Sequence, residues 1–197
     1  MAYWAMRTDK ARPHLIMQEL RSGRLRQGWG YQANQDLRIV LTASQSGQSL
    51  DSDQAAARRN LPMLGHDVNA MQRGDIVLLP NLPDPGTFSL CQLTGSYRFE
   101  IYDVDDVCDY GHTLPVELLK GCEGIPFANE HVGEGLRRTR RNIGRLWRLN
   151  HLREELELIL TLAGQGATFE GRHGVEAQFT KLLGEVRAVR LSMGLCG

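Results

Sequence analysis

The sequence predicts an α+β protein in which a small, strongly bent sheet or pseudo-β-barrel with flanking helices precedes a helical C-terminal extension. Short apolar and aromatic stretches separated by glycine and proline continue to about residue 119, which is typical of strands. Beyond residue 124 the apolar residues recur at helical spacing instead. The hydrophobic fraction of 42% over 197 residues is enough to fill a core. We therefore place a barrel domain at residues 1–124 and an arginine-rich helical hairpin extension at residues 125–197.

The chain begins with a predicted strand followed by a predicted helix. Residues 3–7 are aromatic and apolar, as in a short buried strand. Thr8 or Asp9 can then cap a helix that enters through Pro13, because proline is favoured in the first helical turn. Gly23 predicts the end of this helix.

The next segment, residues 25–31, is predicted to be extended and carries Trp29 between two glycines. Glycines beside a tryptophan indicate a bend or a close approach of the backbone. Residues 44–52 are polar and predict a loop. Residues 54–60 are rich in alanine and arginine and predict a helix that Pro62 ends.

The clearest strand of the chain is residues 76–79, an uninterrupted apolar run after the Arg-Gly-Asp turn at 73–75. Residues 90–94 and 97–102 are separated by Gly-Ser and predict a hairpin. Residues 112–119 predict the closing strand. Together these short strands favour a small sheet that closes on itself.

The C-terminal part of the chain predicts two amphipathic helices, at residues 149–163 and 175–189, joined by a glycine-rich loop. Neither helix can cover its apolar stripe alone. We expect each stripe to pack on the barrel, on the other helix or on a second copy of the chain.

The net charge is zero, from 23 basic and 23 acidic residues, but the charge is unevenly distributed. Residues 133–153 hold seven arginines, no lysine and one glutamate. Guanidinium groups suit bidentate contacts with phosphate better than ammonium groups do. The segment therefore predicts a local field that attracts a polyanion, with a solvated helix face as the alternative.

No residue pattern supports catalysis. Asp84 and Glu100 resemble the carboxylate pair of a metal nuclease, but Tyr102 stands where such a site needs lysine. The four aspartates between residues 103 and 109 lack the spacing and turn glycine of a calcium loop. No paired histidines, serine elbow or phosphate-binding loop is present. We expect a non-enzymatic protein without metal or cofactor.

The cysteines and the hydropathy give an expectation for the cellular compartment. Four widely spaced cysteines without a Cys-x-x-Cys pair fit a reducing cytoplasm, and Cys91 is expected in the core. No apolar run approaches the ~18–20 residues of a membrane span. We expect a cytoplasmic protein with no membrane association.

Aromatic residues of the barrel are the candidates for a binding pocket. Exposed rings stack on nucleic-acid bases, and a concave set can hold an extruded base. Trp29 and Tyr31 are the best candidates, because the glycines around Trp29 cost stability unless the shape requires them. Trp4 is a further candidate wall, although strand aromatics commonly fill the core.

These motifs resemble those of PUA-like domains. The chain opens with Tyr-Trp-x-Met-Arg, continues with Gly-Trp, and then has Asn-x-Met-x-x-Gly-Asp followed by an apolar strand and a glycine turn. The most similar subgroup is the EVE-type and restriction-associated modules of bacterial defence proteins. The matching residues, which lie in the first 120 or so, are Tyr3, Trp4, Met6, Arg7, Gly28, Trp29, Asn69, Met71, Gly74, Asp75, Val77 and Gly95.

The resemblance implies a pseudo-barrel that binds nucleic acid, in several members by gripping a modified or flipped base in an aromatic cage. We expect DNA rather than RNA, in a defence, restriction or phage context. Trp4, Trp29 and Tyr31 would wall the base pocket, and Asn69 or Asp75 would order its rim. The expected phosphate ligands are Arg7, Arg137, Arg138, Arg140, Arg141, Arg145 and Arg148.

Two alternatives remain at this stage. The helical hairpin could instead form a homodimer or dock on a nuclease or ATPase partner, with the stripe from Leu149 to Leu160 as the functional surface. A metal-dependent nuclease in the acidic loop at residues 103–109 is the third hypothesis. Binding assays on duplex and single-stranded DNA, light scattering and plasmid cleavage separate the three.

Overall fold

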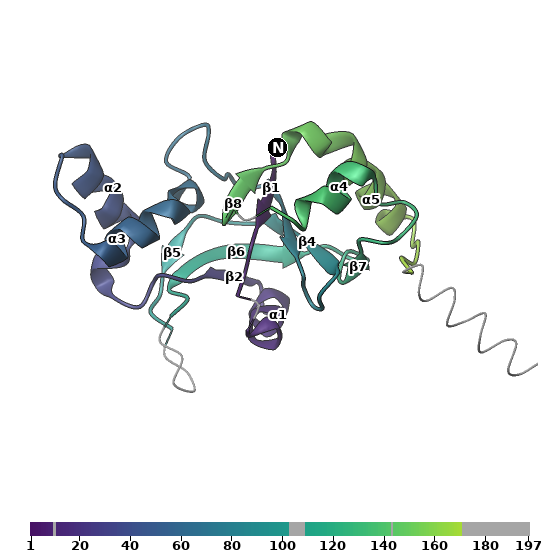
Figure 1. Cartoon of the computed structure of the whole chain (residues 1–197), viewed down its shortest axis with the longest axis horizontal. Helices are drawn as coiled ribbons and strands as arrows, with labels where there is room; N and C mark the ends of the chain where they lie inside the picture. Colours follow the sequence, from purple (N-terminus) through teal and green to yellow (C-terminus); the bar gives the residue numbers. More distant parts are fainter. Residues whose placement is uncertain (10, 103–108, 143, 171–197) are drawn as a thin grey trace, which may run out of the picture.

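A computed structural model describes residues 1–9, 11–102, 109–142 and 144–170. These residues fold into a curled, mixed β-sheet with helices on both sides (Figure 1). The strands are β1 (Tyr3–Met6), β2 (Arg24–Gln27), β3 (Ile76–Pro80), β4 (Thr87–Leu93), β5 (Arg98–Phe99), β6 (His112–Leu118), β7 (Ile125–Pro126) and β8 (Leu146–Arg148). The α-helices are α1 (Pro13–Arg21), α2 (Leu37–Gln45), α3 (Ser52–Ala57), α4 (Glu134–Thr139) and α5 (Arg153–Gly164). Three short 3₁₀ segments among the described residues are Ala33–Gln35, Arg58–Leu64 and Asn150–Leu152.

The strand order is β2-β6-β4-β3-β1-β8, with β5 added to β6 and β7 added to β4. The first strand lies between a parallel neighbour, β3, and an antiparallel neighbour, β8. The remaining pairs are antiparallel. The β1–β3 pair is parallel and therefore needs a long crossover, which holds α1, β2, α2 and α3.

The central strands are buried on both faces, which explains their continuous apolar sequence. Successive side chains of a strand point to opposite faces. In β1, Trp4 and Met6 contribute to one core, and Tyr3 and Ala5 contribute to the other. The first core contains α1, α2 and the 3₁₀ segment after α3, and the second contains α4 and α5.

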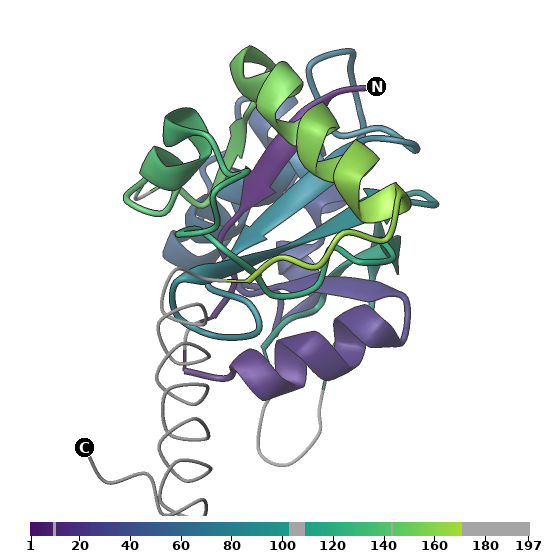
Figure 2. The ribbon, with the colours of Figure 1, turned by 90° about the vertical axis from the view of Figure 1, so that its right-hand side faces the viewer.

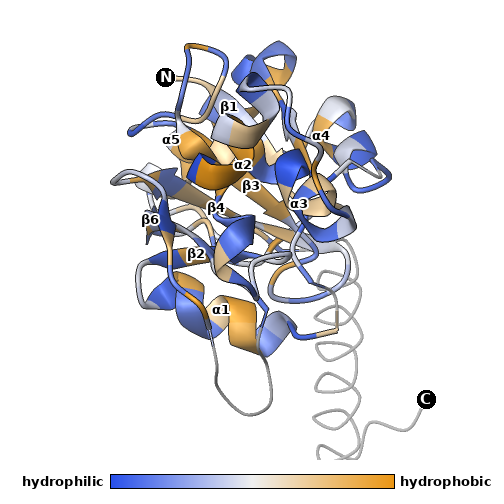
Figure 3. Ribbon diagram, turned by 90° about the vertical axis from the view of Figure 1, so that its left-hand side faces the viewer, coloured by the Kyte–Doolittle hydropathy of each residue, from blue (hydrophilic) through white to orange (hydrophobic). Residues whose placement is uncertain are grey.

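The helices pack against different parts of the sheet. In Figure 1, α2 and α3 lie at one end of the molecule and α4 and α5 at the other. Figure 2 shows α5 crossing over the sheet, with α1 on the opposite side. Figure 3 shows hydrophobic residues in β3 and β4 and also in α1 and α2. The sheet is thus the shared wall of two apolar layers.

Several predicted elements are confirmed. The fold is α+β with a bent sheet and flanking helices. The helix begins at Pro13, although Arg12 and not Thr8 or Asp9 stands at its N-cap position. The predicted strand at 76–79 is β3, which is buried throughout. Cys91 lies in the core, where burial raises the pKa of its thiol.

The secondary structure differs from the prediction at three places. Residues 90–94 and 97–102 do not pair with each other, because β4 pairs with β3 and β6 and the short β5 pairs with β6. The sequence analysis also missed α2, which Asp36 caps through the backbone N–H of Arg38. The helix at 54–60 is α3 followed by 3₁₀ turns that include Pro62, so this proline lies inside the turn.

The segment after residue 124 contributes to the same sheet. β8 pairs with β1, and α5 packs its apolar residues Leu156, Ile159 and Ala163 against the second core. The stripe from Leu149 to Leu160 is therefore largely covered by this chain's own sheet. The predicted second helix at 175–189 lies outside the described residues. Among those that are described, no helix has the length and hydropathy needed to cross a bilayer.

Candidate nucleic-acid interface

A cavity with a volume of about 840 Å³ lies beside the Gly28-Trp29-Gly30 segment. This size is in the range of small-molecule binding sites. Three arginines and two aspartates supply its charges, and Trp29, 40% exposed, supplies an aromatic surface. We call this cavity the Trp29 pocket; its lining residues are Arg7, Thr8, Asp9, Gln27, Gly28, Trp29, Arg59, Asp109, Tyr110, Gly144 and Arg145.

The backbone holds Trp29 in a conformation that tryptophan rarely adopts. Its φ is +65°, in the left-handed region that favours glycine. Such a conformation costs about 1–3 kcal/mol and persists only where surrounding contacts impose it. Gly30 provides one such contact, because a Cβ added there would lie 2.8 Å from the backbone nitrogen of Gly111. The close backbone approach predicted from the two glycines is thus present.

A buried hydrogen-bond chain fixes the carbonyl of Trp29. The backbone N–H of Leu37 donates to the Tyr97 hydroxyl at 3.3 Å, and Tyr97 Oη lies 2.8 Å from His112 Nδ1. On the other side of the imidazole, Nε2 lies 2.8 Å from the Trp29 carbonyl oxygen. A carbonyl only accepts, so Nε2 carries the proton and the Tyr97 hydroxyl donates to Nδ1. Burial lowers the pKa of His112 to about 4, which keeps the ring neutral.

Arg145 covers the ring of Trp29. Its guanidinium carbon lies 3.5 Å from the ring centroid, and Nη1 donates to the Ala56 carbonyl at 3.0 Å. Among the described residues, no carboxylate forms an ion pair with Arg145. Burial, with a further contribution from the charge of Arg59, lowers the pKa of Arg145. The pocket therefore contains a partly desolvated cation that forms no ion pair with the described carboxylates, although the charge of Asp109 acts on it.

Asp109 is one of the two carboxylates that line the Trp29 pocket. Its Oδ1 accepts the backbone N–H groups of Gly30 at 2.9 Å and Tyr110 at 2.7 Å. These two bonds hold the carboxylate in place. The other acid, Asp9, is used internally, because it accepts the Tyr110 hydroxyl and the Ala11 N–H. Asp109 Oδ2 receives no hydrogen bond from the described part of the chain.

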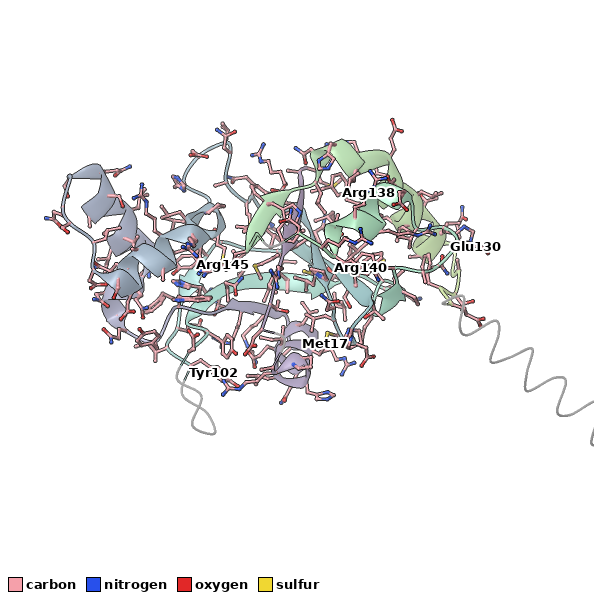
Figure 4. The ribbon with its side chains drawn as sticks, in the orientation of Figure 1. Met17, Tyr102, Glu130, Arg138, Arg140 and Arg145 are labelled. Atoms are coloured by element: carbon pink, nitrogen blue, oxygen red, sulfur yellow. The ribbon has the colours of Figure 1, made fainter. Side chains whose placement is uncertain are left out.

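A second, smaller cavity of about 290 Å³ adjoins α4. Arg140 and Arg141 line it, are exposed, and form no ion pair with the described residues. Figure 4 labels Arg140 and Arg145. We call this cavity the α4 pocket; it is lined by Phe127, Ala128, Glu134, Arg137, Arg138, Arg140 and Arg141.

Three arginines expected to bind phosphate are engaged in the fold. Arg137 donates to the carbonyls of Phe127 and Asn129. Arg138 pairs with Glu134 at 3.2 Å. Arg148 donates to the Val68 carbonyl at 3.1 Å and lies 4.9 Å from the centroid of the Trp4 ring. Arg140 and Arg141 are exposed, and their guanidinium groups form no hydrogen bond or ion pair with the described residues. Arg145 contacts the Ala56 carbonyl and the Trp29 ring but no carboxylate of the described part of the chain.

Trp4 does not line the Trp29 pocket. It is 3% exposed, and its indole N–H donates to Asp75 Oδ2 at 2.9 Å. Asp75 also accepts the backbone N–H groups of Ala2 and Gln72. Both residues therefore organise the first strand and its neighbouring turn, and neither reaches the cavity. The expectation that they form its wall and rim is wrong, because the alternation of β1 turns Trp4 into the core.

Tyr31 and Asn69 also lie outside the lining of the Trp29 pocket. The Tyr31 hydroxyl is hydrogen-bonded to Asp53, which raises the pKa of Tyr31 to about 12. Asn69 is exposed in the loop before β3, where its N–H donates to Asp67. Of the residues predicted for the site, the structure brings Arg7, Trp29 and Arg145 together.

The sequence analysis missed Arg59, Asp109 and Tyr110 as pocket residues. Asp109 was grouped with an acidic loop of which residues 103–108 lie outside the described range. Gly111 offered a signal, because a second glycine can permit the close approach that Gly30 requires. Among the described residues, no group of three or more His, Cys, Asp or Glu side chains is arranged to hold a metal ion.

Comparison with known proteins gives one distant structural neighbour to report. No family model matches the chain, and no curated protein matches it. The NMR structure of Rpa0253 from Rhodopseudomonas palustris is 15% identical, with 84% of this chain and 94% of that chain covered and a TM-score of 0.39. A similarity this low carries no argument about the site.

Proposed function

We propose that this protein binds DNA without catalysing a reaction, taking one base into the Trp29 pocket and holding adjoining phosphates with exposed arginines. The PUA-like character expected from the sequence motifs is part of this proposal. The observation that carries it is the pocket itself, in which an exposed indole lies beside a guanidinium group that forms no ion pair within the described part of the chain. Bases stack on aromatic rings and on guanidinium planes, and phosphates pair with arginine.

The construction of the pocket supports a binding role. Trp29 combines an unfavourable backbone conformation with 40% exposure of a large apolar side chain. The backbone conformation costs stability in a protein that only needs to fold. The His112 hydrogen bond and the Gly30–Gly111 contact maintain the arrangement. A ligand that stacks on the indole gives a physical reason for all of these features.

The two pockets are close enough for one strand to reach both. Gly144 lines the Trp29 pocket, and Arg141 lines the α4 pocket. These residues are three positions apart, so their Cα atoms are separated by at most about 11 Å. About three nucleotides of a stacked strand cover that distance at 3.4 Å each. A base at Trp29 therefore allows phosphates of the same strand to meet Arg140 and Arg141.

The salt dependence of binding tests the role of the α4 pocket. We expect R140A/R141A to remove two phosphate contacts and to reduce the slope of log K against log salt by about 1.4 for single-stranded DNA. Filter binding between 50 and 200 mM salt measures this slope on single-stranded and duplex DNA. The matched control is R73A/R98A, which removes two exposed arginines that line neither pocket.

The outcomes separate the proposal from its alternatives. An unchanged slope in R140A/R141A, or an equal change in the control, would contradict the phosphate role of the α4 pocket. Absence of DNA binding by the unmodified protein would refute the proposed function.

A further inference from the structure

The chemistry of the Trp29 pocket also suggests which bases it accepts. We infer that the carboxylate of Asp109 makes this pocket select bases with an exocyclic amino group, namely adenine, cytosine and guanine, over thymine. The inference rests on the proposed function, because it names the ligand class of the same site.

Asp109 is placed to act as a fixed acceptor. The two backbone N–H groups of Gly30 and Tyr110 occupy Oδ1 and orient the carboxylate. The second oxygen, Oδ2, lies over the backbone of Gly28, where an added Cβ would be 2.8 Å away from it. Gly28 directly precedes Trp29, so this oxygen lies next to the backbone that carries the indole.

Asp109 Oδ2 also lacks a donor within the described part of the chain. A carboxylate oxygen in a partly enclosed site is stabilised when a donor reaches it and is costly when none does. The other carboxylate of the pocket, Asp9, already accepts from Ala11 and from Tyr110. Of the two carboxylates that line the pocket, Asp109 therefore offers a ligand an oriented oxygen that no described donor occupies.

The four DNA bases differ in what they offer to such an acceptor. The amino groups of adenine, cytosine and guanine present N–H donors at the edge of the ring, and Glu or Asp accepts from the cytosine amine in base recognition. Thymine has no amino group. Its single ring N–H lies between two carbonyl oxygens, which a carboxylate repels. Arg59 and Arg145, which also line the pocket, can donate to ring nitrogens and carbonyls.

A guest-base series tests the inference at constant charge. The probes are single-stranded nine-mers of thymidine in which the central base is adenine, cytosine, guanine, thymine or absent. All five carry the same phosphates, so differences in Kd by fluorescence anisotropy report the base alone. We expect the best amino-bearing guest to bind at least about fivefold more tightly than thymine, the lower limit for a good side-chain contact with a base. Thymine should bind about as weakly as the abasic probe.

D109N is the diagnostic variant, because asparagine keeps the Oδ1 acceptor for both backbone N–H groups and replaces Oδ2 with an amino donor. We expect it to abolish the preference over thymine. D84N is the matched control, because it removes the same charge from an exposed turn outside the pocket, and it should keep the preference.

The results distinguish this inference from the proposed function. Binding of all five probes with equal Kd, or tightest binding of the thymine probe, would overturn the selection by Asp109 and leave DNA binding intact. A preference that D109N retains would overturn the assignment to Asp109. Failure of every probe to bind would refute the proposed function as well.

Discussion

His112 couples the acid stability of the fold to the geometry of the Trp29 pocket. The neutral ring accepts from Tyr97 at Nδ1 and donates to the Trp29 carbonyl from Nε2. Its pKa is about 4 in the folded protein, against an ordinary value of 6.5, mainly because the ring is buried. The charges of Asp109 and Asp36 oppose this shift, and that of Arg145 adds to it.

The sign of the change in stability with pH follows from the protons that His112 binds in the folded and unfolded states. Between pH 6.5 and pH 4 the unfolded chain takes up a proton at His112 that the folded protein does not, so stability falls as the pH falls through this range. The difference between the two pKa values corresponds to about 3 kcal/mol. Urea unfolding followed by circular dichroism at pH 7.5, 6.0, 5.0 and 4.0 measures the loss.

H112Q isolates the contribution of this residue. Glutamine can accept from Tyr97 and donate to Trp29, but it does not titrate. We expect the free energy of unfolding of the unmodified protein, relative to that of H112Q, to decrease by about 3 kcal/mol from pH 7.5 to pH 4. Parallel pH profiles for the two proteins would refute the assignment of a buried, neutral His112.

Three further substitutions test packing by urea unfolding. W4A should cost about 3–5 kcal/mol, because it removes a buried indole, and a loss under 1 kcal/mol would contradict its place in the core. G30A should destabilise by about 1–3 kcal/mol through the clash with Gly111, and a neutral result would contradict the close backbone approach. E19Q should lower the free energy of unfolding by about 3 kcal/mol at pH 7, because Glu19 pairs with the buried Arg26. The arginine partners of Glu19 lower its pKa to about 2. This E19Q deficit should shrink as the pH falls from 4.5 towards 2, and a deficit constant over that range would contradict a charged pair.

The sequence predicts the central strands of the fold well because their signal is local. The run from Ile76 to Leu79 is buried on both faces, so every residue is apolar and no alternation is needed. The pairing of strands cannot be predicted from local sequence in the same way. β5 has only two residues, Arg98 and Phe99, and pairs with β6. Residues 100–111 connect the two strands, and this connection is too long to be recognised from a short hairpin turn motif.

The candidate site shows the same division between local and non-local information. The glycines around Trp29 indicated a constrained segment, and the structure shows one. Trp4 is the same residue type as Trp29 and was therefore also a candidate for the pocket. Its position in β1, where side chains alternate between the two faces, places it in the core instead. Arg145 and Asp109 come from segments far apart in the sequence, so their meeting at Trp29 depends on the pairing of β8 with β1 and on the fold around Gly111.

The central claim, that Trp29 faces a space where a base can stack, is tested most directly by tryptophan fluorescence during titration with single-stranded DNA. The comparison is between the unmodified protein and W29F, which keeps Trp4 and Trp147 as internal references. We predict that DNA quenches the emission of the unmodified protein and leaves that of W29F nearly unchanged. Equal quenching of both proteins would contradict the claim.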